Sequence, residues 1–301
     1  MREAESQAGT AGIQDSKPEP SGLWFCGARR VELAGRPHVM GILNVTPDSF
    51  SDGSFFLDPE RAVERALEME AEGADSIDIG GESTRPFAAP VGEQEELQRV
   101  IPVIERLAGR LAIPMSIDTW KSSVAREALR AGAEIVNDVS GCTFDPAMCE
   151  VVASAGAGLV LMHTRGKPRE MQLDTGYRAL VPEIIDFLRD RIEYAESQGI
   201  PRERVVVDPG IGFGKSADGN LEILRHLRKF SVLGRPILIG TSRKSFIGTV
   251  LGRQVDERLF GTAATVALAV AGGASIVRVH DVRQMRDVAL MAHAVAYSPT
   301  G

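Results

Sequence analysis

Residues 205–216 read VVVDPGIGFGKS, which is three valines, an aspartate and a glycine-rich loop. The apolar run is typical of a strand that is buried on both faces of a parallel sheet. The loop has the glycines and lysine of a nucleotide-binding loop, but both known spacings fail. A P-loop needs a glycine where Pro209 stands, and a dinucleotide fingerprint needs one where Lys215 stands. The loop therefore needs another explanation, and the strand before it is the feature that recurs.

The same pattern, an apolar run that ends in a polar residue, occurs eight times. The expected strands are HVMGIL (38–43), SIDIG (76–80), PMSID (114–118), EIVND (134–138), LVLMH (159–163), VVVDPG (205–210), ILIGTS (237–242) and SIVRVH (275–280). Helical patterns are expected at 58–74, 95–108, 119–133, 146–155, 177–199, 219–230, 257–274 and 282–296. Eight strand–helix units in about 250 residues predict an α/β fold, a (β/α)8 TIM barrel of eight parallel strands. An open doubly wound sheet, which needs fewer strands, is the alternative. LWFCGARRVEL (23–33) is expected to form a short N-terminal hairpin under the barrel.

Composition excludes several classes of protein. The 301 residues are 44% hydrophobic and 25% charged, with a net charge of −7 and a pI near 5.4, which argues against general nucleic-acid binding. A run of 18 apolar residues is absent, so we expect no membrane span. Three cysteines without metal spacing indicate a reducing, cytoplasmic location. Residues 1–21 are expected to be a disordered tail, followed by a single barrel domain over 22–299.

The strand ends carry polar residues, and in this fold those ends form the active-site rim. One such residue is more often a turn former or helix cap, but eight strands that all supply one indicate a site. The basic residues suit a phosphate, and the carboxylates and amide suit a flat heterocycle with N–H edges. Long Gly/Ser/Pro/Asp-rich loops at 44–56 and 80–92 are expected to act as lids. The rim residues are Asn44, Glu82, Ser83, Thr84, Arg85, Asp118, Asn137, Asp138, His163, Asp208, Ser242, Arg243, Lys244, Arg278 and His280.

Motifs along the chain resemble those of the dihydropteroate synthase family of pterin-binding enzymes. They run in order from about residue 30 to 293, through every expected strand. The stretches are MGILNVTPDSFSDG (40–53), DIGGESTRP (78–86), SIDTWKSSVAREAL (116–129), IVNDVSG (135–141), LMHTRGKPREMQ (161–172), DPGIGFGKS (208–216), GTSRKSFIG (240–248) and IVRVHDV (276–282).

The resemblance implies a reaction and a role for each site residue. It implies that a homodimer that uses Mg²⁺ condenses 6-hydroxymethyl-7,8-dihydropterin diphosphate with p-aminobenzoate to give 7,8-dihydropteroate and diphosphate. The expected route is SN1-like, with direct displacement left open, and sulfonamides would occupy the p-aminobenzoate site as mimics. The implied pterin residues are Asp118, Asn137, Met162, Asp208 and Lys244. The implied diphosphate residues are Asn44, Thr84, Arg85, Arg278 and His280, with Asn44 also at the metal. The implied p-aminobenzoate wall is Thr84, Pro86, Gly212, Phe213, Lys244 and Ser245. Of these, Asn44, Arg85, Lys244, Arg278 and His280 are the implied catalytic residues.

On this interpretation Asp208 binds the pterin edge, and the glycines after it allow a close backbone approach. Lys215 is expected at the surface or at a helix start. Three rival functions stay open: a pterin methyltransferase barrel, a non-catalytic binding homologue and a sugar-phosphate barrel enzyme. The first has no use for a diphosphate cluster, and the second should have lost lid or anchor residues.

Overall fold

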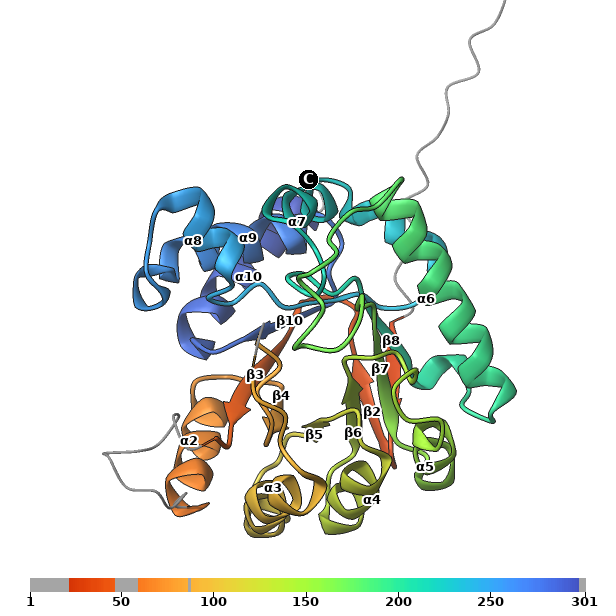
Figure 1. The fold of residues 1–301 in the computed structure, drawn as a ribbon. Helices are drawn as coiled ribbons and strands as arrows, with labels where there is room; N and C mark the ends of the chain where they lie inside the picture. The colour runs from red at the N-terminus through yellow and green to blue at the C-terminus, as the bar shows by residue number, and fades with distance from the viewer. Residues whose placement is uncertain (1–21, 47–58, 86–87, 298–301) are drawn as a thin grey trace, which may run out of the picture.

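A ring of eight parallel strands forms the centre of the molecule. The computed structural model describes residues 22–46, 59–85 and 88–297 (Figure 1). Around the ring the strands follow the order β8-β7-β6-β5-β4-β3-β10-β9. Their bounds are β3 His38–Asn44, β4 Ser76–Gly80, β5 Met115–Asp118, β6 Ile135–Asp138, β7 Gly158–Met162, β8 Val205–Asp208, β9 Leu238–Ile239 and β10 Ile276–Val279. All eight expected strands are confirmed, at nearly their predicted positions.

The ring closes between β8 and β9. Val207 forms a parallel bridge with Ile237, and its N–H donates to the Pro236 carbonyl at 3.0 Å. β9 contributes just two residues to the ladder, so this seam is the weakest pairing among the described strands. Closure confirms the predicted barrel and excludes the open doubly wound sheet, because an open sheet leaves its two end strands apart.

Helices surround the strands (Figure 1). They are α2 Pro59–Ala71, α3 Glu93–Leu107, α4 Ser122–Ala131, α5 Met148–Ala155, α6 Leu180–Ser197, α7 Ala217–Arg225, α8 Ser245–Leu251, α9 Leu259–Ala271 and α10 Val282–Tyr297, with 3₁₀ turns at Arg202–Arg204, Leu227–Leu233 and Val255–Glu257. Each expected helix is found. The short α8 was not predicted, since seven residues are too few for a periodic pattern. Among the described residues, no helix is both long and apolar enough to cross a bilayer.

The N-terminal hairpin closes the end of the barrel where the strands begin. β1 (Leu23–Cys26) pairs antiparallel with β2 (Arg29–Glu32), as expected. Trp24 is fully buried among residues that include Met40 and Ile135, and its indole N–H donates to the Arg204 carbonyl at 2.8 Å. The bottom is therefore filled with apolar side chains, so that ligand access is left to the opposite end. The predicted tail, residues 1–21, lies outside the described residues.

Candidate active site

Four side chains from different strands meet inside the open end of the barrel. Arg278 of β10 pairs through Nε with Asp78 Oδ2 at 2.5 Å and through Nη2 with Asp118 Oδ2 at 2.6 Å. Asn137 of β6 donates from Nδ2 to the same Asp78 oxygen at 2.8 Å. Three of these residues were predicted. Asp78 was missed, although a carboxylate in the middle of the apolar run SIDIG was a usable signal.

Each carboxylate in this network keeps one oxygen without a partner. Asp78 Oδ1 and Asp118 Oδ1 are buried and accept no hydrogen bond from the described residues. Burial raises the pKa of Asp118 to about 7, although the charge of Arg278 opposes the shift. Because unpartnered buried acceptors are costly, these two oxygens are suited to a ligand that brings its own N–H groups.

The loop after β8 places a third carboxylate beside a lysine. Asp208 Oδ1 accepts the Gly210 N–H at 2.7 Å, and burial raises the pKa of Asp208 while the charge of Lys244 opposes the rise. Lys244 donates from Nζ to the Ile211 carbonyl, and burial lowers its pKa to about 8. Gly212 has a φ of +83°, and a Cβ there would lie 3.2 Å from Lys244 Cδ, so glycine leaves room for the lysine.

An apolar floor lies next to these charges. Val139, Met162, Met171 and Phe213 form a small buried cluster, with Trp120 packed against it. Lys244 Nζ is 4.7 Å from the centre of the Phe213 ring, within the range of a cation–π contact. The predicted pterin residue Met162 and the predicted p-aminobenzoate residue Phe213 therefore share one wall, and Lys244 stands at its edge.

Lys215 directly precedes the N-cap of α7, in keeping with the predicted helix start, but the alternative prediction of a surface position is wrong. Its side chain is buried, with residue exposure of 3%, and Nζ contacts His163 Nδ1 at 2.9 Å, the Phe213 carbonyl at 2.8 Å and the His163 carbonyl at 3.3 Å. Burial lowers the pKa of Lys215 well below its usual range. The lysine points inward because Gly214, with a φ of +65°, turns the chain just before it. It joins the end of β7 to the loop after β8, a contact that spacing alone does not show.

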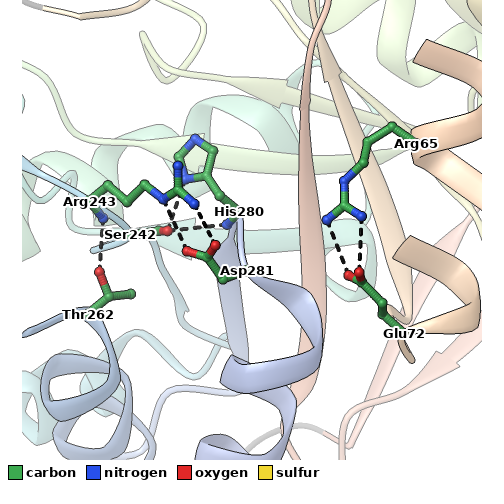
Figure 2. A network of polar contacts seen from close by, with 7 residues as sticks. All are labelled: Arg65, Glu72, Ser242, Arg243, Thr262, His280 and Asp281. Atoms are coloured by element: carbon green, nitrogen blue, oxygen red, sulfur yellow. Dashed lines mark hydrogen bonds and ion pairs between the residues drawn. The ribbon is translucent and has the colours of Figure 1, made fainter. Parts of the chain in front are cut away.

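A second group of polar residues follows β9 and β10. Ser242 Oγ accepts the backbone N–H of His280 at 3.2 Å and lies 2.9 Å from His280 Nδ1. Arg243 forms two contacts with Asp281, from Nε at 3.1 Å and from Nη2 at 2.5 Å, as Figure 2 shows. Burial lowers the pKa of His280 to about 3, and the charges of Arg278, Arg243 and Arg85 contribute to the shift. These basic groups therefore share one neighbourhood, and Arg85 itself is exposed.

The predicted lids are described only in part. Of the first loop, residues 47–56 lie outside the described ranges, as does Pro86 of the second. The base of the second loop is fixed by Lys121, whose Nζ pairs with the buried carboxylates of Glu82 and Glu96. Glu82 Oε1 also accepts the Val91 N–H at 3.0 Å. Glu96 was not predicted, since it reads as an ordinary residue of an amphipathic helix.

Three further predicted residues lie at the rim without contacts to the rest of the site. Asn44 ends β3 half-buried, Thr84 is half-buried in the second loop, and Ser245 is exposed at the start of α8. Within the described residues their side chains form no hydrogen bond with the other predicted site residues, and no cluster of three or more His, Cys, Asp or Glu forms a metal site.

Comparisons with known proteins identify the family. The family model described as pterin binding enzyme matches residues 40–280. A dihydropteroate synthase from Synechocystis sp. is 49% identical over 86% of this chain and 90% of its own length. The dihydropteroate synthase of Xanthomonas albilineans with 4-aminobenzoic acid superposes with a TM-score of 0.86 at 45% identity, over 92% of this chain and 99% of that one. The Yersinia pestis enzyme with a sulfonamide drug gives 0.86 at 41% identity, over 91% and 98%. The resemblance seen in the motifs is confirmed, and the chain belongs to the pterin-binding enzymes, in the dihydropteroate synthase family.

Proposed function

We propose that this chain condenses 6-hydroxymethyl-7,8-dihydropterin diphosphate with p-aminobenzoate, releasing 7,8-dihydropteroate and diphosphate. One observation carries the proposal: two unpartnered carboxylate oxygens, of Asp78 and Asp118, lie in the same barrel mouth as Lys244 and the basic residues around His280. A flat ring with N–H groups satisfies the first set, and an anion satisfies the second.

The pterin occupies the acidic interior in this proposal. Asp118 and Asp208 accept N–H groups of the ring, and Asn137, which donates to Asp78, keeps an amide oxygen for the same edge. Met162 supplies an apolar surface for the ring. The predicted role of Lys244 fits its position, because its ammonium group lies in the field of both Asp208 and Asp118.

The diphosphate lies on the basic side. Arg85 and His280 face it, and Arg278, which is paired with Asp78 and Asp118, stands between pterin and anion. Mg²⁺ is a proposed cofactor that Asn44 would hold together with diphosphate oxygens and water, a ligand set that this ion commonly uses. When bound, Mg²⁺ supplies charge neutralisation to the leaving diphosphate.

p-Aminobenzoate binds against Phe213 and Lys244, with Thr84, Pro86, Gly212 and Ser245 as the remaining proposed wall. Sulfonamides bind in the same place as mimics. The Phe213–Lys244 contact at 4.7 Å supports an aromatic ring beside a cation here. A competition assay checks this: a sulfonamide should raise the apparent KM for p-aminobenzoate and leave that for the pterin unchanged.

The carbon–oxygen bond to diphosphate breaks before the amine attacks, by an SN1-like route. The dihydropterin spreads positive charge from its exocyclic methylene, and the Asp118 and Asp208 carboxylates stabilise that charge. A weakly basic aryl amine needs little deprotonation before attack, so this route demands no dedicated general base. A pterin substrate with a substituent that destabilises the cation should react much more slowly. An unchanged rate would favour direct displacement.

A second copy of this chain covers α9 and α10. Thr262, Val266 and Val270 of α9 pack inward, while Phe260 is 85% exposed and Leu268 is 62% exposed. On α10, Met291 and Val295 are also exposed, and α9 packs beside α10, so the apolar side chains lie on one face. Such a face favours a protein interface. Phe260→Asp should convert a dimer to a monomer in sedimentation, whereas Val232→Asp, at another exposed valine, should not.

The decisive experiment is incubation of the chain with the pterin diphosphate, p-aminobenzoate and Mg²⁺. Coupled release of dihydropteroate and diphosphate is expected. Release of neither product would favour a binding homologue, and methyl transfer from methyltetrahydrofolate would favour the methyltransferase rival.

Three free buried thiols, Cys26, Cys142 and Cys149, support the proposed reducing, cytoplasmic location. Fractionation of cells that express the tagged chain tests it.

A further inference from the structure

The side chain of Ser242 and the ring of His280 form a hydrogen bond whose direction can be worked out. A serine hydroxyl has one proton and two lone pairs. The backbone N–H of His280 already donates to Ser242 Oγ at 3.2 Å, which uses one lone pair. His280 Nδ1 is the other partner, at 2.9 Å. Either the hydroxyl donates to Nδ1, or Nδ1–H donates to the hydroxyl.

Burial decides between the two directions. Ser242 is 5% exposed, and the described residues offer its hydroxyl proton no acceptor other than His280 Nδ1. If Nδ1 carried the ring proton, two N–H groups would point at one oxygen and the hydroxyl proton would be buried without an acceptor, which is costly. The hydroxyl therefore donates to Nδ1. The neutral ring then carries its proton on Nε2, which has no partner within the described residues.

We propose that Ser242 is a positioning residue that fixes His280 in the tautomer with the proton on Nε2, so that the ring donates a hydrogen bond to the departing diphosphate. The inference rests on the proposed function, because the diphosphate is the leaving group of that reaction. A donor held ready in this way stabilises charge as it develops, without reorientation of the ring. A neutral ring is also in keeping with the surroundings, since Arg278, Arg243 and Arg85 already supply positive charge there.

Contacts around Ser242 and His280 fix the loops that follow β9 and β10 relative to each other. Arg243 has a φ of +57°, a conformation that disfavours a residue with a side chain. Its N–H donates to Thr262 Oγ1 at 3.0 Å, and its carbonyl accepts from Arg258 Nη1 at 3.0 Å. The Arg243–Asp281 ion pair then joins the residue after Ser242 to the residue after His280 (Figure 2). The backbone is therefore fixed at both partners of the hydrogen bond.

The test combines NMR of the free protein with steady-state kinetics. Imidazole ¹⁵N shifts in histidine-labelled protein report the tautomer, and His280→Gln assigns the signal. The wild type should show His280 protonated on Nε2, and Ser242→Ala should shift the ring toward a mixture of tautomers. The Ser242→Ala variant should lose on the order of tenfold in kcat, which corresponds to the loss of about one hydrogen bond, with little change in the KM for p-aminobenzoate. Ser242→Thr, which keeps the hydroxyl, should restore both the spectrum and most of the rate.

Ser275→Ala is the matched control. Ser275 is also 5% exposed, but it stands at the start of β10, at the opposite end of the barrel. An Nδ1–H signal for His280 in the wild type would overturn the inference, and so would an unchanged spectrum in Ser242→Ala. Equal losses of kcat in Ser242→Ala and Ser275→Ala would also overturn the inference, because they would show a general packing effect. Because the spectrum needs no substrate, failure of the proposed reaction is recognised separately, by a wild type that releases no diphosphate.

Discussion

Replacing Lys215 with methionine should reveal how much a buried lysine amine contributes to this site. Lys215 Nζ donates to the carbonyls of His163 and Phe213 and contacts His163 Nδ1, and each partner is buried or nearly so. Methionine fills similar space but leaves the two carbonyls without this donor. At pH 9 the buried amine is neutral and has two N–H groups, so at about 1 kcal/mol for each lost bond the variant should be destabilised by about 2 kcal/mol. At lower pH the wild type has to bury a protonated, charged Lys215, which costs free energy. The methionine variant avoids that cost and is therefore destabilised less.

The pH dependence follows from the direction of the Lys215 pKa. Burial lowers that pKa in the folded state, with the charge of Lys244 adding to the shift and Asp208 opposing it. Between the lowered pKa and the ordinary lysine value of about 10.4 the unfolded chain binds more protons, so the stability of the wild type rises with pH. The methionine variant lacks this slope. The difference in unfolding free energy should therefore be larger at pH 9 than at pH 6.

Urea denaturation of both proteins at pH 6 and pH 9 measures the difference. Lys229→Met is the control, because Lys229 is exposed on the segment after α7 and should change neither value by more than about 0.5 kcal/mol. The variant should also show a raised KM for p-aminobenzoate, since the Phe213 carbonyl loses its anchor. A Lys215→Met protein as stable as the wild type at pH 9, or a difference that shrinks as pH rises, would refute the reasoning.

Three other changes have clear expected outcomes. Lys244→Ala should raise the KM for both substrates, because its side chain lies between Phe213 and the pterin carboxylates; an effect on one substrate alone would contradict that placement. Asp118, with a pKa near 7, should lose its ability to accept pterin N–H groups as pH falls through 7, and Arg278→Met should move this midpoint in a fluorescence binding titration to higher pH. Gly158→Ala should lower the melting temperature by several degrees, because its Cβ would lie 2.7 Å from Cys26 Sγ.

Much of the barrel was predictable because its strands are short, apolar and regularly spaced. Runs such as SIDIG and PMSID are buried along their full length, which is the composition that parallel strands need. The polar residues at their ends could be placed on one rim because the fold brings all carboxyl ends together. The hairpin was predictable from two short runs around Gly27, whose φ is +59°.

The sequence did not show which polar groups would pair. Asp78 and Arg278 are 200 residues apart in the sequence. They meet because their strands, β4 and β10, both lie next to β3 in the closed ring. Arg278 was predicted to bind diphosphate, but its guanidinium is already held by Asp78 and Asp118. Lys215 was expected at the surface or at a helix start, and lysine rarely is buried. A turn at Gly214 and two facing carbonyls override that tendency, and neither has a signature in one sequence.

The segregation of charge explains how an acidic chain can bind an anion. The net charge of −7 belongs to the whole sequence, whereas a ligand responds to the groups within about 10 Å of it. Inside the barrel mouth Asp78 and Asp118 surround the guanidinium of Arg278. Burial is the main cause that lowers the pKa of His280 to about 3, and the charges of Arg278, Arg243 and Arg85 lower it further, while Asp281 opposes them, so the nearby charges are mostly positive. Positive charge that develops on a pterin and negative charge that develops on its leaving group thus meet opposite fields, and Arg278 separates them. Reversing the charge of the residues on either the pterin side or the diphosphate side alone should therefore slow the reaction more than it weakens substrate binding. The reason is that the charges on the pterin and on the leaving group are largest in the transition state.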